Sequence, residues 1–336
     1  MPDKHGALIG CGFFARNHMH AWNEVEGADI VAVCDTDANR ARAFAQEFDA
    51  AAFVDAATMM RETKLDFVDI VTQPKSHRSL VELAAAHRLP IVCQKPLARE
   101  PEDARAMVRA CATADVPLMV HENFRWQKPM RALKTEAADL GELFFGRISF
   151  RSAYDVYRNQ PYLAEDPRFI IADLGVHLLD LARFFFGEVE ALTCVTQRIH
   201  PAIKGEDVAT ILLKMRSGAT CLVDLSYATQ LETDLFPQTL VTLEGRAGCI
   251  TLGPHYALTT VRGRETTHRI LTPPLYSWSQ PVFEFVQDSV VTAQQHWIDC
   301  LRTGQETETS GSDNLKTLAL VFGSYQSAET EEPYHP

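Results

Sequence analysis

The sequence contains no long hydrophobic run, and no stretch approaches the roughly 18 apolar residues that cross a membrane. Its first residues, Met1 to His5, are too few and too polar for a secretory signal peptide. The residues therefore offer neither a membrane anchor nor an export signal. We expect a soluble protein that stays in the cytoplasm and has no membrane partner.

Closely spaced cysteines are also missing. Eight cysteines are present, but no two are near enough for a CxxC-type motif, and no cysteine and histidine cluster has the spacing of zinc ligands. We therefore expect no metal centre, and we expect the cysteines to be buried and reduced.

Positive charge is scarce as well. Lys and Arg number 32 against 44 Asp and Glu, a net charge of -12 that would repel the phosphate backbone of nucleic acid. A small molecule is therefore the expected partner. At 336 residues the chain exceeds the size at which one hydrophobic core usually divides, so two domains are expected.

In the first third of the chain, short apolar runs alternate with segments whose apolar residues recur at helical spacing. The runs are Ala7 to Ile9, Ile30 to Val33, Phe67 to Val71, Ile91 to Val92 and Leu118 to Val120. The helical segments are Asp37 to Phe48, Ser76 to His87 and Pro101 to Asp115. This alternation predicts that residues 1–122 form an α/β domain, a parallel sheet covered by helices on both faces.

Residues 123–336 change to longer extended runs joined by tight turns, after a helical stretch around Met130 to Leu140. The runs are Phe144 to Ser152, Val189 to Arg198, Val208 to Met215, Ala219 to Ser226 and Thr239 to Leu243. They predict an α+β domain with a large, mostly antiparallel open sheet. Two helices within residues 283–328 should close the chain, and the tail from Glu329 to Pro336 should be frayed. A broad sheet needs its second face covered, which favours a homodimer or homotetramer.

A glycine-rich turn directly follows the first apolar run, with the residues Gly10, Cys11, Gly12, Phe13, Phe14 and Ala15. Gly10 would make the tight bend, Gly12 would let the backbone approach a pyrophosphate, and Ala15 would let the next helix pack on the strand. The N-terminus of that helix would face the negative charge. A purely structural turn is the alternative. Because strand, turn and helix occur in the required order, we predict a Rossmann cofactor site that includes Phe13 and Phe14.

Asp35 ends the second apolar run, 25 residues after Gly10. A carboxylate at this place accepts hydrogen bonds from the adenosine ribose of a dinucleotide and would repel a phosphate on that ribose. No arginine follows directly, although Arg40 or Arg42 could reach a phosphate if the next helix began later than expected. The residues therefore favour NAD over NADP as the cofactor.

Lys95 follows the apolar run of Ile91 and Val92, with Gln94 before it and Pro96 after it. Open α/β sheets bind ligands at the carboxyl ends of their strands, and the ring of Pro96 would fix the local backbone. A solvated surface lysine is the more common case. We nevertheless predict that the ammonium group of Lys95 binds a substrate hydroxyl and the cofactor ribose, with Gln94 beside the cofactor.

Asp173, His177 and Asp180 share one face of an apolar stretch that should be helical, because residues four and seven apart lie in one row. A histidine in such a row is usually a buried core residue. Two observations favour chemistry instead. Gly175 costs about 1 kcal/mol inside a helix, which suggests a close approach there, and an apolar helix has no packing reason to carry two carboxylates and an imidazole. We predict that Asp173 and His177 are catalytic and that Asp180 is structural.

In these residues the chain resembles the glucose-fructose oxidoreductase, inositol dehydrogenase and rhizopine-catabolism (Gfo/Idh/MocA) family over nearly its whole length. That family has Glu-Lys-Pro where this chain has Gln94, Lys95 and Pro96, and an Asp and a His four residues apart where it has Asp173 and His177. The resemblance implies that Lys95, Asp173 and His177 are the catalytic residues. Only a contact that needs the carboxylate of the family's Glu would be lost.

The family's Thr-Pro-Asn-x-x-His stretch appears here as Thr72, Gln73, Pro74, Lys75, Ser76 and His77. Thr72 and His77 match the pattern, which implies backbone contacts to the cofactor near Thr72. His77 should start a helix, in a structural or cofactor-adjacent role.

Polar and aromatic side chains cluster where the two domains should join, which suits a ligand with many hydroxyl groups. They are Asn123, Arg125 and Trp126, with Arg151, Tyr154 and Arg168 as weaker candidates for substrate binding. A hydrated hinge held by salt bridges is the alternative for each of these residues.

The resemblance implies an NAD-dependent oxidoreductase that acts on a CH–OH group of a sugar or polyol. The stretches His121 to Gln127 and Asp155 to Tyr157 most resemble bacterial aldose dehydrogenases, with the branched pentose D-apiose as one candidate substrate. Oxidation at the anomeric carbon to a lactone or aldonate is therefore expected. The alternatives are an inositol-type polyol dehydrogenase that makes a ketone, a reductase of an imine or enal, and a non-catalytic NAD-binding regulator.

Overall fold

The computed structural model describes residues 4–158 and 160–336, and the chain divides into two compact units. Unit 1 comprises Met1–Asn123 and Gln287–Leu315, and unit 2 comprises Phe124–Val286 and Lys316–Pro336. The expected boundary after residue 122 lies one residue from the first division. The structure differs in placing Gln287–Leu315 with the first unit, whereas the sequence analysis kept that segment in the second domain.

Unit 1 is built on a parallel sheet, whose strands in the described residues follow the order β3-β2-β1-β4-β5-β6. The strands are β1 (Lys4–Ile9), β2 (Ala28–Cys34), β3 (Ala51–Phe53), β4 (Phe67–Ile70), β5 (Ile91–Gln94) and β6 (Leu118–His121). The chain first builds outward from β1 through β2 to β3 and then crosses to β4. Ligands of such sheets bind beyond the carboxyl ends of the strands at this change of direction, which is where Gly10, Thr72 and Lys95 lie.

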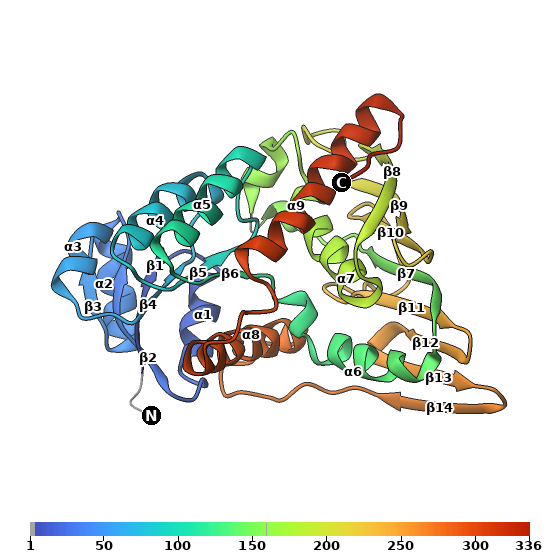
Figure 1. Ribbon diagram of the computed structural model, residues 1–336, viewed down its shortest axis with the longest axis horizontal. Coiled ribbons are helices and arrows are strands. Elements are labelled where there is room, and N and C mark those ends of the chain that lie inside the picture. Colours follow the sequence, from blue (N-terminus) through green and yellow to red (C-terminus); the bar gives the residue numbers. More distant parts are fainter. Residues whose placement is uncertain (1–3, 159) are drawn as a thin grey trace. The chain divides into compact units, whose positions relative to one another are not determined.

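Helices connect these strands, and α4 and α5 lie side by side against the sheet (Figure 1). The helices are α1 (Ala15–Trp22), α2 (Ala38–Phe48), α3 (Ala56–Glu62), α4 (Pro74–Ala86) and α5 (Pro101–Ala114). Strands β4, β5 and β6 are buried at every position, as expected of strands covered on both faces. The predicted α/β architecture of this unit is confirmed, and the helix starting at Pro74 begins two residues earlier than expected.

The segment Gln287–Leu315 belongs to unit 1 because it completes the core of that unit. Its helix α8 (Glu284–Thr303) carries Trp297, which is fully buried and packs edge-on against Phe67 of β4. Beyond the helix, Thr309 exchanges backbone and side-chain hydrogen bonds with Val120 at the outer strand β6. Nothing in the local sequence distinguishes this helix from one that stays in the second domain.

Unit 2 contains a large sheet with the strand order β14-β13-β12-β11-β7-β10-β9-β8 in the described residues. The strands are β7 (Leu143–Arg151), β8 (Val189–Gln197), β9 (Val208–Met215), β10 (Thr220–Ser226), β11 (Leu240–Gly245), β12 (Gly248–Leu252), β13 (Ala257–Arg262) and β14 (Glu265–Ile270). All described pairs are antiparallel except β7 with β10, which is parallel. The predicted mostly antiparallel sheet is therefore confirmed.

One face of this sheet carries the core of unit 2, and helix α7 (Val176–Phe186) packs on it over β7 and β10 (Figure 1). Along β7 the buried residues Ile148 and Phe150 point toward this face, and a side chain on Gly146 would overlap the ring of Phe186. Residues at the alternate positions point the other way. Helices α6 (Lys128–Ala137) and α9 (Gly311–Thr330) complete the described helical part.

The C-terminal tail is ordered rather than frayed, so that expectation is wrong. Tyr334 and Leu192 of β8 exchange two backbone hydrogen bonds of 2.9 Å, which adds a short bridge to the edge of the sheet. The ring of Tyr334 also lies where a side chain on Gly323 would otherwise be. The sequence showed only the polarity of the tail, whereas backbone pairing needs no apolar pattern.

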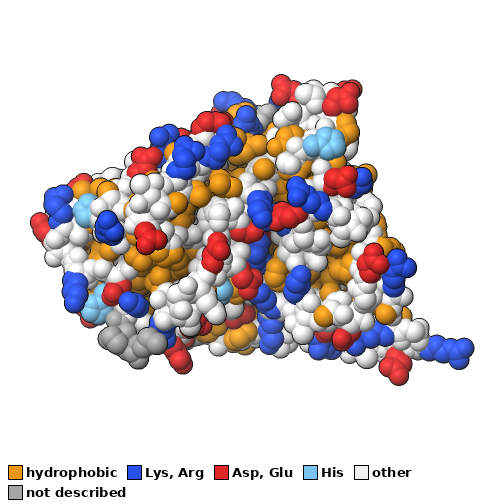
Figure 2. All heavy atoms as spheres, viewed as in Figure 1, with side chains coloured by type: hydrophobic (Ala, Val, Ile, Leu, Met, Phe, Trp, Pro, Cys, Tyr) orange, Lys and Arg blue, Asp and Glu red, His pale blue; other side chains and the backbone are white. Residues whose placement is uncertain are grey.

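On the face shown in Figure 2, basic and acidic side chains of the described residues are interspersed over the surface. No helix in the described part of the chain is both long and apolar enough to span a bilayer. The cysteines form no disulfide among the described residues, and all are buried except Cys249, which is half-buried.

Candidate active site

The glycine-rich turn after β1 has the geometry of a dinucleotide site. Gly10 has a φ of 101°, and a Cβ on it would lie 2.5 Å from the carbonyl oxygen of Val71, so only glycine fits. At Gly12, by contrast, an added Cβ would meet no atom of the described residues within 4 Å. Phe13 is 74% exposed, while Ala15 is fully buried at the start of α1. The turn is thus packed on the protein side and open on the side where a pyrophosphate would approach.

Asp35 links this turn to the start of α2. One carboxylate oxygen accepts a hydrogen bond of 2.8 Å from the backbone N–H of Cys11, and the other accepts one of 2.8 Å from Asp37. The side chain is 9% exposed, and Arg40 forms an ion pair of 3.0 Å with it. Burial, followed by the negative charge of Asp35, raises the pKa of the Cys11 thiol to about 12, so this thiol stays protonated.

The two arginines considered as phosphate ligands are both held near α2. Arg40 pairs with Asp35, and the Nη2 atom of Arg42 donates to Asn39 at 2.8 Å. Helix α2 begins at Ala38 with Asp37 as its N-cap, close to the start of the segment Asp37 to Phe48 expected to be helical. The carboxylate is therefore already in place beside the turn, which fits the ribose of NAD and disfavours the extra phosphate of NADP.

His77 connects the loops that follow β4 and β5. Its ring lies 3.1 Å from the carbonyl oxygen of Thr72 and 3.0 Å from that of Leu97, and the residue is fully buried in α4. Burial lowers the pKa of His77, against the opposing effect of the two carbonyl groups. This placement gives His77 a bracing role between the two loops, and Ser76 donates to the Thr72 hydroxyl at 2.8 Å.

Lys95 stands at the carboxyl end of β5 and is half-buried. Its backbone N–H donates to the side-chain oxygen of the preceding Gln94 at 2.7 Å. Gln94 is 8% exposed and also contacts the ring of His18, so its side chain points into unit 1. The sequence analysis placed Gln94 at the cofactor and missed its connection to His18, which is far away along the chain.

In unit 2 the stretch that carries Asp173 begins with a π-helical turn, Ile171–Gly175, which leads into α7. A regular α-helix was expected, so this detail is corrected. In the wider π-turn a spacing of four residues falls short of a full turn, and such turns are frequent at functional sites. Asp173 is half-buried in this turn, and His177 is 3% exposed in the first turn of α7.

The close approach inferred at Gly175 is made by the protein itself. A Cβ on Gly175 would lie 3.2 Å from the side chain of Leu225 and 3.3 Å from that of Ile171. The glycine therefore lets the helix pack on β10, and its cost has a structural reason. The ring of His177 stacks on Phe124 with centroids 3.8 Å apart and an angle of 6°, which fixes the plane of the imidazole.

A buried carboxylate holds the start of this helical segment. Glu206 accepts hydrogen bonds from the backbone N–H groups of Phe169 at 3.2 Å and Ile171 at 3.0 Å. The hydroxyl of Tyr325 donates to Glu206 at 2.8 Å and accepts from the N–H of Ala172 at 3.0 Å. A negative charge at a helix N-terminus is favourable, so Glu206 and Tyr325 fix the turn that carries Asp173. No local pattern in the sequence points to either residue.

Asp180 forms a buried ion pair with Arg125. The Nε and Nη2 atoms of Arg125 lie 2.7 Å and 2.6 Å from the two carboxylate oxygens, and Thr317 donates to the same carboxylate at 3.2 Å. This two-point contact fixes the residues after Phe124 against α7. The structural part predicted for Asp180 is consistent with this geometry, and Arg125 shares it.

The remaining candidates for substrate binding lie in varied settings. Asn123 is buried in unit 1 and donates to Ser289 at 2.7 Å. In unit 2 the guanidinium of Arg131 lies 3.7 Å from the ring centre of Trp126, covering one face of the indole. Tyr154 stacks on Phe236 with centroids 3.8 Å apart.

Two arginines are placed differently from the other candidates. Arg151 points to the sheet face opposite α7, where it pairs with Asp224 at 3.0 Å together with Arg147. This placement argues against the expected role of Arg151 in substrate binding, because strand alternation turns it away from His177. Arg168 is exposed and lies over the rings of Phe322 and Tyr325.

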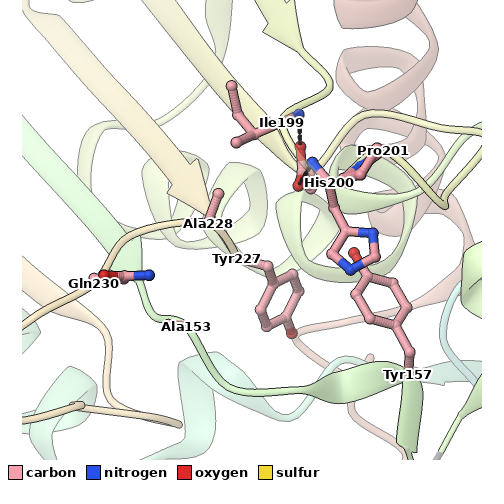
Figure 3. A pocket seen from close by; sticks show the side chains of 9 residues that line it. Ala153, Tyr157, Ile199, His200, Pro201, Tyr227, Ala228 and Gln230 are labelled. Atoms are coloured by element: carbon pink, nitrogen blue, oxygen red, sulfur yellow. Dashed lines mark hydrogen bonds between the residues drawn. The ribbon is translucent and has the colours of Figure 1, made fainter.

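Unit 2 also contains a pocket of about 270 Å³ that the sequence analysis missed (Figure 3). Its lining residues are Ala153, Tyr157, Ile199, His200, Pro201, Asp207, Tyr227, Ala228 and Gln230. The side chains of Tyr157, His200 and Tyr227 converge in Figure 3. Burial raises the pKa of Tyr157 to about 12, and burial followed by the charge of Asp173 raises the pKa of Tyr227 well above its ordinary value. Both phenols therefore stay protonated, and Tyr227 is close enough to Asp173 to sense its charge.

Within the described residues no group of three or more His, Cys, Asp or Glu side chains is arranged to hold a metal ion. Burial raises the pKa of the thiols of Cys11, Cys34 and Cys93 above the ordinary value. These thiols are therefore poor nucleophiles, and the chemistry must come from other groups.

Comparison with known proteins gives consistent results along the chain. Residues 4–122 match the oxidoreductase family with an NAD-binding Rossmann fold, and residues 132–251 match the GFO/IDH/MocA C-terminal domain. The chain is 53% identical over 331 residues to a D-apiose dehydrogenase of Rhizobium rhizogenes, covering 98% of this chain and 96% of that protein. It is 54% identical over 326 residues to a D-apiose dehydrogenase of Paraburkholderia graminis, covering 96% and 87%.

A solved structure of an oxidoreductase from Agrobacterium radiobacter, in complex with NAD+, L-tartaric acid and magnesium, has a TM-score of 0.97 and 52% identity to this chain. The match covers 99% of this chain and 98% of that one. The chain is thus an NAD-dependent dehydrogenase that acts on CH–OH groups of sugars, and it belongs to the Gfo/Idh/MocA oxidoreductase family.

Proposed function

We propose that this enzyme oxidises D-apiose at its anomeric carbon and produces the lactone or the acid derived from it. The choice of D-apiose as substrate rests on the 53% and 54% identity to two D-apiose dehydrogenases over nearly the whole chain. An aldose in its ring form presents a carbinol carbon bearing one hydrogen and one hydroxyl. Oxidation at that carbon removes a hydride and a proton and leaves the carbonyl of a lactone.

The residues around the glycine turn would bind the cofactor. Gly10, Gly12 and Ala15 with the exposed Phe13 and the half-buried Phe14 would hold the pyrophosphate, and Asp35 would accept from the ribose. Backbone groups near Thr72, braced by His77, and the loop of Gln94 and Lys95 would complete the contacts. When bound, NAD supplies the acceptor for the hydride of the anomeric carbon.

The hydroxyl proton goes to His177 in this proposal. A hydride leaves a carbinol carbon at low cost only if the hydroxyl proton is removed, and a neutral imidazole is the suitable base near neutral pH. The stacked ring of Phe124 presents its electron-rich face to His177, which favours the charged imidazolium once it forms. Asp173 orients the imidazole and stabilises its charge.

Lys95 has the complementary task of an electrophile. Its ammonium group would donate a hydrogen bond to the substrate oxygen and stabilise the negative charge that this oxygen gains as the proton leaves. Its backbone is fixed by Gln94, so the ammonium group works from an anchored position. The alternative is that Lys95 is the base and acts as a neutral amine, and substitution of Lys95 and His177 separates the two assignments.

The sugar's other hydroxyl groups need polar partners. The pocket beside Tyr227 offers two protonated phenols and an imidazole, and we propose that Tyr157 and Tyr227 contribute there. Asn123, Trp126, Tyr154 and Arg168 stay proposals for substrate contacts, and Arg125 would act by holding α7. Arg151 is left out, because it lies on the other face of the sheet.

The proposal is tested with purified enzyme, NAD and a panel of aldoses and polyols. NADH formation should be fastest with D-apiose, and NMR of the product should show the anomeric carbon converted to a lactone or carboxylate. A ketone with an unchanged anomeric carbon would instead identify a polyol dehydrogenase. Binding of NAD without turnover of any sugar would favour the regulator.

We further propose a homodimer or homotetramer in which a second copy covers the outer face of the large sheet. That face exposes apolar side chains, with Val195 at 61% and Leu212 at 49% exposure on neighbouring strands. Sedimentation velocity should give a mass of two or four chains, and Leu212→Glu should shift it toward the monomer. A monomeric unmutated protein would contradict this assembly.

A further inference from the structure

A chain of buried polar side chains lies behind Lys95 in unit 1. It runs from Asp69 on β4 through His18 on α1 to Gln94 at the end of β5. The Nδ1 atom of His18 lies 2.7 Å from Asp69, the Nε2 atom of His18 lies 3.0 Å from the amide nitrogen of Gln94, and the backbone N–H of Lys95 donates to the Gln94 oxygen at 2.7 Å. His18 and Asp69 are 0% exposed and Gln94 is 8% exposed.

The direction of each hydrogen bond follows from its neighbours. The backbone N–H of Lys95 can only donate, so the Gln94 atom that faces it must be the oxygen. The amide nitrogen of Gln94 then faces His18 and donates, which requires a ring nitrogen without a proton. The single ring proton of His18 must therefore sit on Nδ1, where it is donated to Asp69. With His18 neutral, each of these three hydrogen bonds joins one donor to one acceptor.

Asp69 is the anionic end of this arrangement. Besides His18, the indole N–H of Trp22 donates to the same carboxylate oxygen at 2.8 Å. The negative charge is thus held by two donors from one face of α1, four residues apart. Burial, followed by the charge of Asp69, raises the pKa of the Cys93 thiol, so Cys93 is neutral beside the chain.

Other groups surround the His18 ring and bear on its protonation. The ring of His121 at the end of β6 lies with its centroid 4.2 Å away, and Phe14 presents an edge contact at 5.5 Å. The backbone oxygen of His18 accepts from Gln294 of α8 at 3.4 Å.

From this geometry we infer that Asp69, His18 and Gln94 form a positioning device for Lys95, one that works because residue 94 is an amide. A glutamate at this place would carry a carboxylate. A carboxylate can accept from Lys95 but cannot donate to His18, so two acceptors would face each other unless His18 took a second proton. Gln94 and a neutral His18 are therefore matched. The inference rests on the proposed role of Lys95.

The decisive variant is Gln94→Glu, which keeps the size of the side chain and reverses one hydrogen bond. His18 should become an imidazolium, and the positioning of Lys95 should depend on that proton. Relative to the unmutated enzyme at the same pH, turnover should fall by about 10-fold at alkaline pH, where the extra proton is lost, because small displacements of a reacting group cost large factors in rate. The ratio should recover toward acidic pH.

Two further variants separate charge from packing. Gln94→Met keeps the volume but removes both hydrogen bonds, so its turnover should fall without the new dependence on pH. Gln46→Glu places the same charge change on an exposed position of α2 and should behave as the unmutated enzyme. If Gln94→Glu and Gln46→Glu share the same pH profile of kcat, the positioning device is disproved.

The tautomer is measured without any turnover. Long-range proton–nitrogen NMR spectra of histidine-labelled enzyme distinguish the two neutral tautomers from the imidazolium, and His18→Gln identifies the signals. The unmutated protein should show His18 protonated on Nδ1 alone, and Gln94→Glu should show both nitrogens protonated. A proton on Nε2 in the unmutated protein would overturn the inference. If Lys95→Ala stays active while the tautomer is as expected, the proposed role of Lys95 fails and the hydrogen-bond chain stands.

Discussion

In unit 1, Lys95 ends a strand and its backbone is fixed by directional hydrogen bonds, whereas in unit 2 His177 is fixed by apolar packing. Gln94 must donate to one neighbour and accept from another, so its chemical identity matters more than its shape. His177 lies flat on Phe124 within a largely apolar helix, so shape matters more there. Isosteric polar substitutions should therefore damage the first arrangement, and changes of volume should damage the second.

The difference suits the two proposed tasks. As a positively charged donor, Lys95 must be held in place while its ammonium group stays hydrated or paired. The hydrogen bond from its backbone N–H to Gln94 achieves this without burying the ammonium group. A base must take up a proton and lose it again in each cycle, so its ring should be held in a way that does not depend on one protonation state. Stacking on Phe124 meets that condition, because it constrains the ring plane in both states.

The largest effect should come from removing the imidazole. His177→Ala should lower turnover by about 10²- to 10⁴-fold, the range for losing a general base. NAD affinity should stay nearly unchanged, because the residues proposed to bind NAD belong to unit 1. Steady-state kinetics and NAD titration measure the two effects, with His268→Ala on the exposed strand β14 as control.

The same experiment assigns the base. If His177→Ala keeps near-normal turnover, and Lys95→Ala abolishes turnover together with the alkaline-activated limb of the pH profile, then Lys95 is the base. The base would then be Lys95, which is held by hydrogen bonds, and not His177, which is held by stacking.

The next largest effect concerns the cofactor in unit 1. Asp35→Ala should weaken NAD binding by about 10- to 100-fold, the range for hydrogen bonds to a charged group, and should relax the preference over NADP. The carboxylate also holds the N–H of Cys11, so the glycine turn should loosen. Calorimetric titration of both dinucleotides measures this.

Asp37→Ala is the matched control for Asp35. It removes the N-cap of α2 and should lower the stability slightly, without a comparable loss of NAD affinity. Equal or tighter NADP binding in the unmutated enzyme would contradict the assignment of Asp35.

The sequence predicted those parts of the molecule that are determined by residues close together in the chain. The turn from Gly10 to Ala15 and the helix expected over Asp37 to Phe48 each depend on residues close together in the chain, and their patterns identified them correctly. Strand β14 is exposed at every position and shows no apolar run, and β3 has only three residues, so both were missed.

The networks that hold the candidate residues could not be predicted for a different reason. Tyr325 reaches Ala172 across 153 positions and His18 reaches Gln94 across 76. A hydrogen bond between distant residues leaves no periodicity in either segment. The sequence therefore showed which residues carry the chemistry proposed here, and only the fold shows what positions them.

A smaller effect is expected where α7 is held by a buried polar contact rather than by packing. Tyr325→Phe removes the hydroxyl that joins Glu206 to the N–H of Ala172. The free energy of unfolding should fall by about 1 to 3 kcal/mol, the cost of leaving buried polar groups unsatisfied. Turnover should fall less than in His177→Ala. Tyr162→Phe, which removes an exposed hydroxyl, is the control in urea unfolding and should change little. Equal stability of the two variants would mean that packing alone holds the start of the helix.

The smallest effect should come from the other end of α7, where Glu188 bridges Arg183 and Lys316 at the surface. Burial by itself would raise the pKa of Glu188, but the bonds from the two cations outweigh it and lower the pKa to about 2 from the ordinary 4.5. The folded state therefore binds this proton less readily than the unfolded state. The resulting stability is present in full above pH 4.5 and is lost as the pH falls toward 2.

Because Glu188 is 38% exposed, solvent screens the pair, and its contribution should stay within about 1 kcal/mol. Glu188→Gln should lower the melting temperature slightly at neutral pH and reduce its further decline between pH 4.5 and 2. Glu190→Gln, whose partner Lys214 has an exposed side chain on β9, is the control. A steeper decline in Glu188→Gln than in the unmutated enzyme would show that the sign of the shift is wrong. If the loss at neutral pH matched that of Tyr325→Phe, the exposed end of α7 would be as important for stability as its buried start.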